Sequence, residues 1–108
     1  MIFIFGGAYA GKEMYAKREF PDKKIIRDIH LIIKSEMENG KNALDATERL
    51  LSQNTDAIFI SNEIGCGIVP EDKFEREWRE TVGRINCYLA EKAERVIRVV
   101  CGIGMTIK

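Results

Sequence analysis

The apolar positions along the chain fall into two kinds of pattern. Short unbroken apolar runs indicate strands buried in a sheet, and apolar residues that recur every three or four positions indicate helices. The runs predict strands at residues 2–5, 25–28, 56–61, 95–101 and 105–108, and the repeats predict helices at residues 12–20, 29–37, 43–53 and 71–93. Strands that alternate with helices predict an α/β fold with a mainly parallel sheet, helices on both faces and a last short strand that doubles back.

A glycine-rich turn joins the first predicted strand to the first predicted helix. It reads G-x-x-x-x-G-K, which is the spacing of a loop that cradles nucleotide phosphates. The glycines allow a tight turn whose N–H groups point into one concavity, while the helix N-terminus and the lysine add positive charge. We therefore expect an anion site at the carboxyl end of the first strand. Its expected residues are Gly6, Gly7, Ala8, Tyr9, Ala10, Gly11, Lys12 and Glu13.

One residue of this segment departs from the motif. The position after the lysine is normally Ser or Thr, whose hydroxyl holds a magnesium ion, and here it is Glu13. A carboxylate can ligate magnesium, but it is longer and brings negative charge beside the phosphates. The segment therefore has two interpretations. One is a site for ATP or GTP with Mg²⁺, and the other is a strand-to-helix turn that binds nothing.

Two acidic residues follow other predicted strands. Asp28 ends the strand at residues 25–28, where a phosphate-loop enzyme keeps the acid that orients magnesium or its waters. We therefore expect Asp28 to be a metal ligand and, with Lys12, a catalytic residue. Because Asp28 also precedes the helix at residues 29–37, capping that helix is an equally good interpretation. Glu63 lies in a loop at residues 62–70, at the carboxyl end of another strand, and is a further candidate nucleotide-binding residue.

His30 and Trp78 are each the only residue of their kind. The apolar helical surroundings of His30 favour a packed or capping role over a catalytic one. Trp78 belongs to a stripe from Phe74 to Leu89 with spacings of four, four, three and four residues, which is typical of one helix face. This stripe and the short chain are compatible with self-association, and the family resemblance given below is the main reason to expect a homo-oligomer, a dimer or a trimer.

Composition and charge argue against several classes of protein. The 108 residues are expected to form one domain, residues 1–108, with 45% apolar and 31% charged residues as in ordinary globular proteins. Lys+Arg and Asp+Glu balance at 17 each, so no basic field predicts binding to nucleic acid or to a membrane surface. No apolar run approaches the ~20 residues of a membrane span, and the start lacks the basic region of a signal peptide. Cys66, Cys87 and Cys101 lack C-x-x-C spacing and are expected to be buried or idle thiols in a reducing cytoplasm.

Three segments carry a resemblance to a known family. The sequences NEIGCGIVPED at residues 62–72 and GRINCYLAEKAERVIRVVCGIGMTIK at residues 83–108 resemble the adenosylcobinamide kinase/adenosylcobinamide-phosphate guanylyltransferase family of cobalamin biosynthesis. The loop of that family runs N-E-V-G-x-G-I-V-P, and its tail ends in G-I-G-x-x-I-K. GGAYAGKE at residues 6–13 is similar to the family's phosphate loop, G-G-x-x-S-G-K-S/T, and residues 26–28 fall where the family has its acidic strand end.

The resemblance implies a particular fold and assembly. The fold would be a RecA-like P-loop sheet with a C-terminal antiparallel strand, and the assembly would be a trimer. In such a sheet, the strand at residues 56–61 should lie between the strands at residues 2–5 and 25–28. That order would bring Glu63 and Asp28 near Lys12.

The resemblance also implies a two-step activity. A nucleoside triphosphate phosphorylates a hydroxyl of adenosylcobinamide, and GMP is then transferred from GTP through a guanylylated histidine, so a corrinoid is an expected partner. Here only residues 21–24 separate the first helix from the acidic strand, so the histidine-bearing segment looks deleted, and His30 does not align with that histidine. With Glu13, this departure argues against guanylyl transfer. The alternative is a catalytically degenerate module that binds a nucleotide or a corrinoid.

Overall fold

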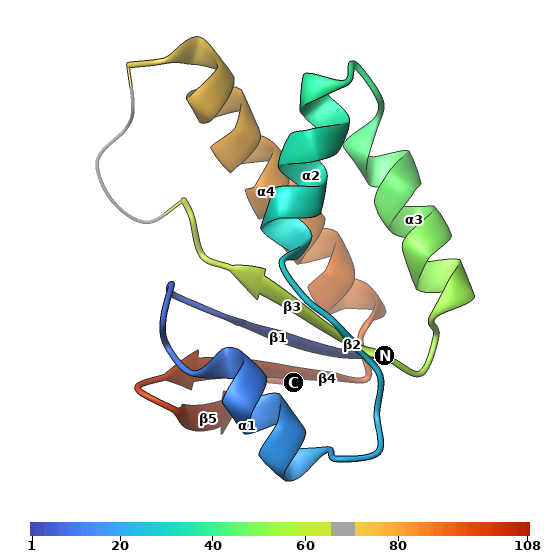
Figure 1. Ribbon diagram of the computed structural model, residues 1–108, viewed down its shortest axis with the longest axis vertical. Coiled ribbons are helices and arrows are strands. Elements are labelled where there is room, and N and C mark those ends of the chain that lie inside the picture. The colour runs from blue at the N-terminus through green and yellow to red at the C-terminus, as the bar shows by residue number, and fades with distance from the viewer. Residues whose placement is uncertain (66–70) are drawn as a thin grey trace.

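The computed structural model describes residues 1–65 and 71–108. Within these residues the chain forms a mixed α/β fold around one five-stranded sheet (Figure 1). The elements, in chain order, are β1 (Ile2–Gly6), α1 (Lys12–Glu19), β2 (Ile25–Ile26), α2 (Ile29–Glu38), α3 (Ala43–Gln53), β3 (Ile58–Asn62), α4 (Lys73–Lys92), β4 (Arg95–Val100) and β5 (Ile103–Thr106).

The sheet has the strand order β2-β3-β1-β4-β5. The first four strands are parallel, and β5 pairs antiparallel with β4. β3 lies between β1 and β2, with Ile25 and Ile2 both in register with Ile58. The prediction that these two strands are not neighbours is therefore confirmed. Their carboxyl ends meet at one edge of the sheet, which is where ligands bind in open parallel sheets.

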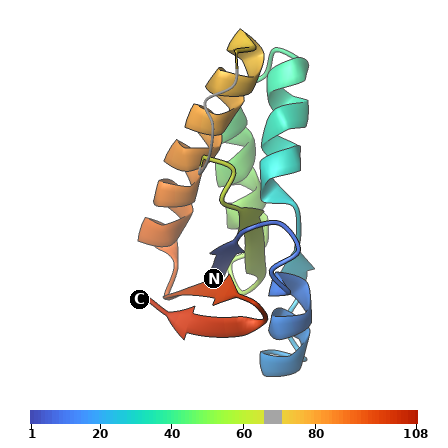
Figure 2. The same cartoon turned by 90° about the vertical axis from the view of Figure 1, so that its left-hand side faces the viewer.

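Each face of the sheet has its own apolar core. Because side chains alternate along a strand, Phe3 of β1 points to one face and Ile2 and Ile4 point to the other. The Phe3 face is covered by α2, α3 and α4, whereas the Ile4 face is covered by α1, whose Ala16 is fully buried. Figure 2 shows the three helices standing together and α1 lying apart from them. The expected helices on both faces are therefore present.

Two of the element boundaries that differ from the sequence prediction lie at residues with positive φ. β2 ends at Ile26 and not at residue 28, because Asp28 has φ 56°, which is incompatible with an extended strand. The turn between β4 and β5 lies at Cys101 and Gly102, with φ 51° and 76°, and not at residues 102–104. Two consecutive residues with positive φ are typical of a tight two-residue hairpin turn.

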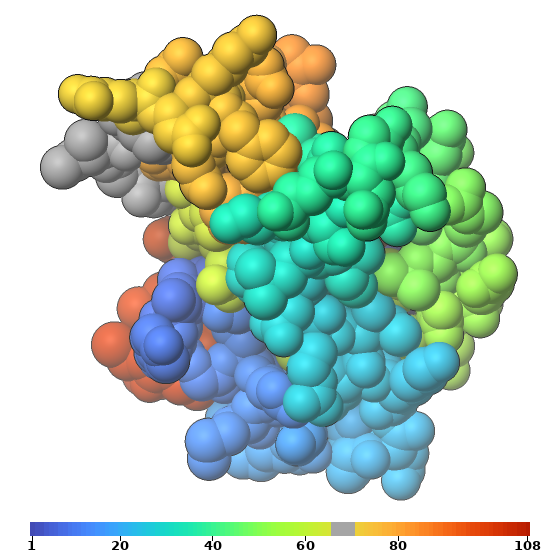
Figure 3. All heavy atoms as spheres, turned by 45° about the horizontal axis from the view of Figure 1, so that its top comes forward, coloured from blue at the N-terminus to red at the C-terminus, as the bar shows by residue number. Residues whose placement is uncertain are grey.

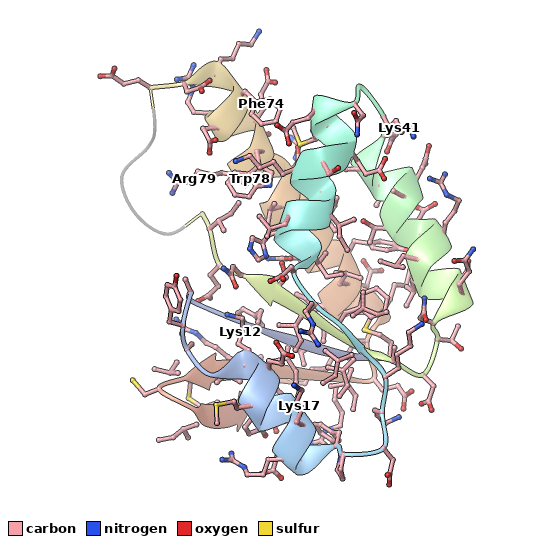
Figure 4. All side chains as sticks on the ribbon, in the orientation of Figure 1. Lys12, Lys17, Lys41, Phe74, Trp78 and Arg79 are labelled. Carbon is pink, nitrogen blue, oxygen red and sulfur yellow. The ribbon has the colours of Figure 1, made fainter. Side chains whose placement is uncertain are left out.

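The stripe on α4 packs inside the protein. Asp72 caps the helix by accepting a 2.9 Å hydrogen bond from the Phe74 N–H, and the stripe then buries Val82, Ile85 and Leu89. Trp78 points toward α2 (Figure 4), and its Nε1–H donates a 2.8 Å hydrogen bond to the backbone oxygen of His30. The second half of the stripe therefore serves the internal core, whereas Phe74 and Trp78 at its beginning are only partly buried. A homo-oligomer remains a prediction.

Two expectations about the surface can be compared with the structure. In residues 1–65 and 71–108, no helix has the length and apolar character needed to cross a membrane. Cys87 and Cys101 are exposed free thiols, so of the two alternatives expected for the thiols, buried or idle, burial does not hold for these two, whereas Cys66 lies outside the described residues.

Candidate functional site

The glycine loop begins where β1 runs closely beside β4. A Cβ atom on Gly6 would lie 2.4 Å from the backbone oxygen of Val99, so only glycine fits at this point without a shift of the strands. Gly11 has φ 86° and immediately precedes α1. The loop is tied to the β4–β5 turn, because the N–H of Gly102 donates a 2.7 Å hydrogen bond to the backbone oxygen of Ala10. Close packing against β4 thus explains Gly6, and the left-handed backbone conformation explains Gly11.

Lys12 is the first residue of α1 and is buried at the end of β1. Its Nζ donates a 2.6 Å hydrogen bond to the backbone oxygen of Gly7, so the side chain folds back along the loop (Figure 4). Burial lowers the pKa of Lys12, whereas the carboxylates of Asp28 and Glu63 act in the opposite direction. Both acids are therefore close enough to interact electrostatically with the lysine. No side chain caps α1, which leaves its first-turn N–H groups to the concavity.

Asp28 stands at the N-cap position of α2 without acting as a side-chain cap. The cap position matches one interpretation of the sequence, but the Asp28 carboxylate accepts no cap hydrogen bond. Its left-handed backbone conformation is sparsely populated for residues other than glycine, although aspartate tolerates it better than most residues. The carboxylate lines the same cavity as Lys12. This placement suits the interpretation of Asp28 as a site residue.

A cavity of about 420 Å³ opens between the glycine loop and the beginning of α2. It is lined by Ala8, Tyr9, Ala10, Gly11, Lys12, Glu13, Arg27, Asp28, Ile60 and Asn62. In the space-filling view the blue loop and the yellow-green end of β3 lie on the same face as α2 (Figure 3). Most of the residues predicted for the site therefore meet at one place. Gly6 and Gly7 shape the loop but do not line the cavity.

The cavity contains residues that the sequence did not single out. Arg27 lies at the carboxyl end of β2, directly before Asp28, and Asn62 lies at the carboxyl end of β3, directly before Glu63. The available signal was their position directly beside Asp28 and Glu63. Neither residue belongs to the glycine motif, so only the sheet order places them near Lys12.

Glu13 is held by two cations on the rim of this cavity. One carboxylate oxygen, Oε1, lies 2.8 Å from a terminal nitrogen of Arg27 and 3.1 Å from Nζ of Lys17, one helical turn further along α1. Lys17 is thus one partner of Glu13, and Arg27 is a second. This one oxygen of Glu13 therefore already carries two ion pairs.

Glu63 faces a neighbouring cavity more than the loop. This second cavity, of about 370 Å³, lies between the sheet and α4, with Phe3, Phe5 and Val82 among its mainly apolar lining. Glu63 is 3.5 Å from Arg98 in a partly exposed ion pair. Glu63 thus acts on Lys12 through its charge without sharing the lysine's cavity. Residues 66–70 of the predicted ligand loop lie outside the described residues.

The buried His30 confirms the expected packed role. It is 6% exposed, its ring centroid lies 6.5 Å from that of Trp78, and its Nδ1 has no hydrogen-bond partner. Burial lowers the pKa of His30, Asp28 raises it, and Lys12 lowers it further.

This lowered pKa predicts a loss of stability in acid. The unfolded chain protonates His30 below about pH 6.5, whereas the folded chain resists protonation. The stability that the folded state gains from a neutral His30 is therefore lost as the pH falls below about 6.5. We expect the unfolding free energy of the wild type to fall faster than that of His30→Leu, by at most about 1.4 kcal/mol for each pH unit. Urea unfolding of both proteins between about pH 8 and pH 5 measures this difference. Parallel curves would contradict the prediction.

The fold and the site together define an α/β protein with a lysine-bearing glycine loop at the carboxyl edge of a parallel sheet. The family model described as cobinamide kinase / cobinamide phosphate guanyltransferase matches residues 22–107. The chain belongs to this family.

Three curated relatives match part of the chain. The bifunctional adenosylcobalamin biosynthesis proteins CobU of Salmonella typhimurium and of Escherichia coli are each 47% identical over 51 residues, which cover 47% of this chain and 28% of each relative. The bifunctional adenosylcobalamin biosynthesis protein CobP of Pseudomonas aeruginosa is 37% identical over 51 residues, covering 47% of this chain and 30% of the relative. The aligned part thus spans less than a third of the length of these relatives.

Proposed function

We propose that this chain is a cobalamin-biosynthesis protein that binds the phosphates of ATP or GTP in its glycine loop. The observation that supports the proposal best is the placement of Lys12, the start of α1 and Asp28 around one cavity at the carboxyl edge of the sheet. The helix N-terminus and the ammonium group would attract the phosphates. Membership of the family supports the biosynthetic role.

The proposed reaction is a phosphoryl transfer of the kinase type. The γ-phosphoryl group would pass from the nucleotide to a corrinoid hydroxyl, leaving a nucleoside diphosphate and a phosphate ester. Lys12 would bind and orient the phosphates, which is most of what catalysis requires in phosphoryl transfer. The second step of the family, guanylyl transfer, is not part of the proposal. In the described residues no histidine lines the cavity, and His30 is buried.

Magnesium fits this site only in part. Asp28 can supply one carboxylate ligand, because its side chain is not used as a helix cap. The hydroxyl ligand expected directly after Lys12 is missing, and Oε1 of the Glu13 carboxylate that stands there is paired with Arg27 and Lys17. In the described residues, no group of three or more His, Cys, Asp or Glu side chains could hold a metal ion. The residues beside the loop therefore do not supply the full set of ligands for the motif's metal position.

A second candidate function is nucleotide or corrinoid binding without turnover. The two ion pairs of Glu13 favour it, because they engage the side chain that stands where phosphoryl transfer normally uses a metal-holding hydroxyl. Both functions predict nucleotide binding, and only the first predicts that ATP or GTP is consumed when adenosylcobinamide is added. Self-association into a dimer or a trimer is proposed for either function on the family resemblance alone.

Calorimetry with ATP and GTP tests the proposed binding, and a Glu13→Thr variant tests the role of the carboxylate. We expect weak binding by the wild type. The threonine restores the compact hydroxyl ligand and removes one negative charge, so magnesium–nucleotide binding should tighten at least about tenfold, or ~1.4 kcal/mol. Absence of binding by the wild type both with and without magnesium would refute the proposed function. Tight magnesium-dependent binding that Glu13→Thr leaves unchanged would show that Glu13 is a working metal ligand.

A further inference from the structure

The ion pair between Glu13 and Arg27 joins two separate parts of the site. Glu13 is in the first turn of α1, and Arg27 lies between β2 and α2. Both residues line the cavity beside Lys12, and their contact of 2.8 Å crosses its rim. Arg27 therefore places a fixed positive charge beside the position from which the motif's hydroxyl would hold a metal ion.

The charges that line the cavity are balanced without a metal. Lys12 and Arg27 are positive, whereas Glu13 and Asp28 are negative. Lys17 adds a further positive charge to the Glu13 oxygen from outside the lining. The negative charge that Glu13 brings to the phosphate loop is thus compensated by side chains. An incoming phosphate would meet two cationic side chains and the loop N–H groups, together with the carboxylates of Glu13 and Asp28.

We infer that Arg27 takes the place of the divalent cation in the phosphate site, so that the loop binds polyphosphate without magnesium. The inference rests on the proposed nucleotide binding of the glycine loop. A guanidinium group has five N–H donors in a planar fork that matches phosphate oxygens. The contact to Glu13 uses one terminal nitrogen, which leaves donors for a bidentate contact to the ligand. Glu13 pairs with Arg27 beside the cavity.

The contrasting possibility is an ion pair with no part in binding. The side chains of Arg27 and Glu13 are 56% and 35% exposed, and exposed pairs often contribute little to stability. A purely structural pair would leave phosphate affinity unchanged when Arg27 is replaced. The two possibilities therefore differ in a measurable quantity.

The test compares Arg27→Gln with Lys17→Gln, since each removes one of the two cations on the same Glu13 oxygen. Lys17 does not line the cavity, so its variant is the matched control. Binding of ATP and of inorganic tripolyphosphate is measured by calorimetry in EDTA and again with excess magnesium. We expect the wild type to bind both ligands in EDTA, with less than about a threefold change on adding magnesium. Arg27→Gln should weaken binding in EDTA by at least about tenfold, and Lys17→Gln by less than about twofold.

Other outcomes separate this inference from the proposed function. Wild-type binding that appears only with magnesium, or equal affinities of the two variants in EDTA, would overturn the role of Arg27 while leaving nucleotide binding in place. Absence of binding under every condition would refute the proposed function itself. Circular dichroism of each variant verifies that the fold is retained.

Discussion

Replacing Lys12 with methionine is expected to weaken ATP and GTP binding about 10- to 100-fold. The ammonium group lies at the start of α1 and points back along the glycine loop, where the phosphates are proposed to bind. A hydrogen bond to a charged group contributes about 1.5–3 kcal/mol, and each 1.4 kcal/mol corresponds to a tenfold change in affinity. Calorimetry on both proteins measures the loss directly.

Lys17→Met is the matched control for this substitution. Lys17 lies further along the same helix, its side chain is 63% exposed, and it does not line the cavity. Its replacement should change nucleotide affinity by less than about twofold. Lys12→Met should remain folded, because methionine fills a similar volume and removes the cost of burying a charged group. Equal losses of nucleotide affinity in the two variants would show that the affinity depends on the net charge of the protein and not on a specific contact in the glycine loop.

The strands and the glycine loop could be predicted because local patterns determine them. Unbroken apolar runs marked the buried strands, and the spacing of Gly6, Gly11 and Lys12 marked the loop. The position of β3 between β1 and β2 came from the family resemblance, because no local pattern encodes strand order. Given that order, the meeting of Lys12 and Asp28 at one edge of the sheet follows.

The glycines of the last hairpin show where local reasoning failed. The two predicted strands at residues 95–101 and 105–108 leave the turn at residues 102–104, but of the two glycines there only Gly102 has the positive φ that a turn requires. Gly104 lies within β5, and a Cβ atom there would come within 2.4 Å of the Tyr15 ring of α1. A glycine needed for close packing cannot be distinguished from a turn glycine by sequence alone.

Side-chain partners were the least predictable part of the site. Arg27, the partner of Glu13, lies between the early end of β2 and the left-handed Asp28. Neither of these backbone features could be predicted from the sequence. The stripe on α4 presents a similar limit. Periodicity identified its apolar face, but it could not decide whether Trp78 faces the protein's own α2 or another subunit.

Replacing Phe59 with alanine is expected to lower the unfolding free energy by about 3–5 kcal/mol. Phe59 is on β3 inside the sheet, is fully buried, and lies directly across from Phe3 of β1. Its loss removes buried apolar area and leaves a cavity that tightly packed neighbours cannot fill. A domain of this size is typically stable by about 5–15 kcal/mol, so the variant should be close to the limit of folding. Urea unfolding should show a lower midpoint with an unchanged slope.

Phe74→Ala is the matched control, because Phe74 has the same side chain but lies half-buried in the first turn of α4. Phe74→Ala should lower the unfolding free energy by less than half as much as Phe59→Ala. The cost of truncation depends on the buried apolar area that is lost and on the size of the cavity that is left. Phe59→Ala should also weaken nucleotide binding only in proportion to the unfolded fraction, because the ring contributes no atoms to the cavity around Lys12. Equal destabilisation by the two substitutions would contradict the placement of Phe59 at the centre of the sheet. A loss of affinity in the fully folded Phe59→Ala protein would instead show that the core beneath β3 positions the site.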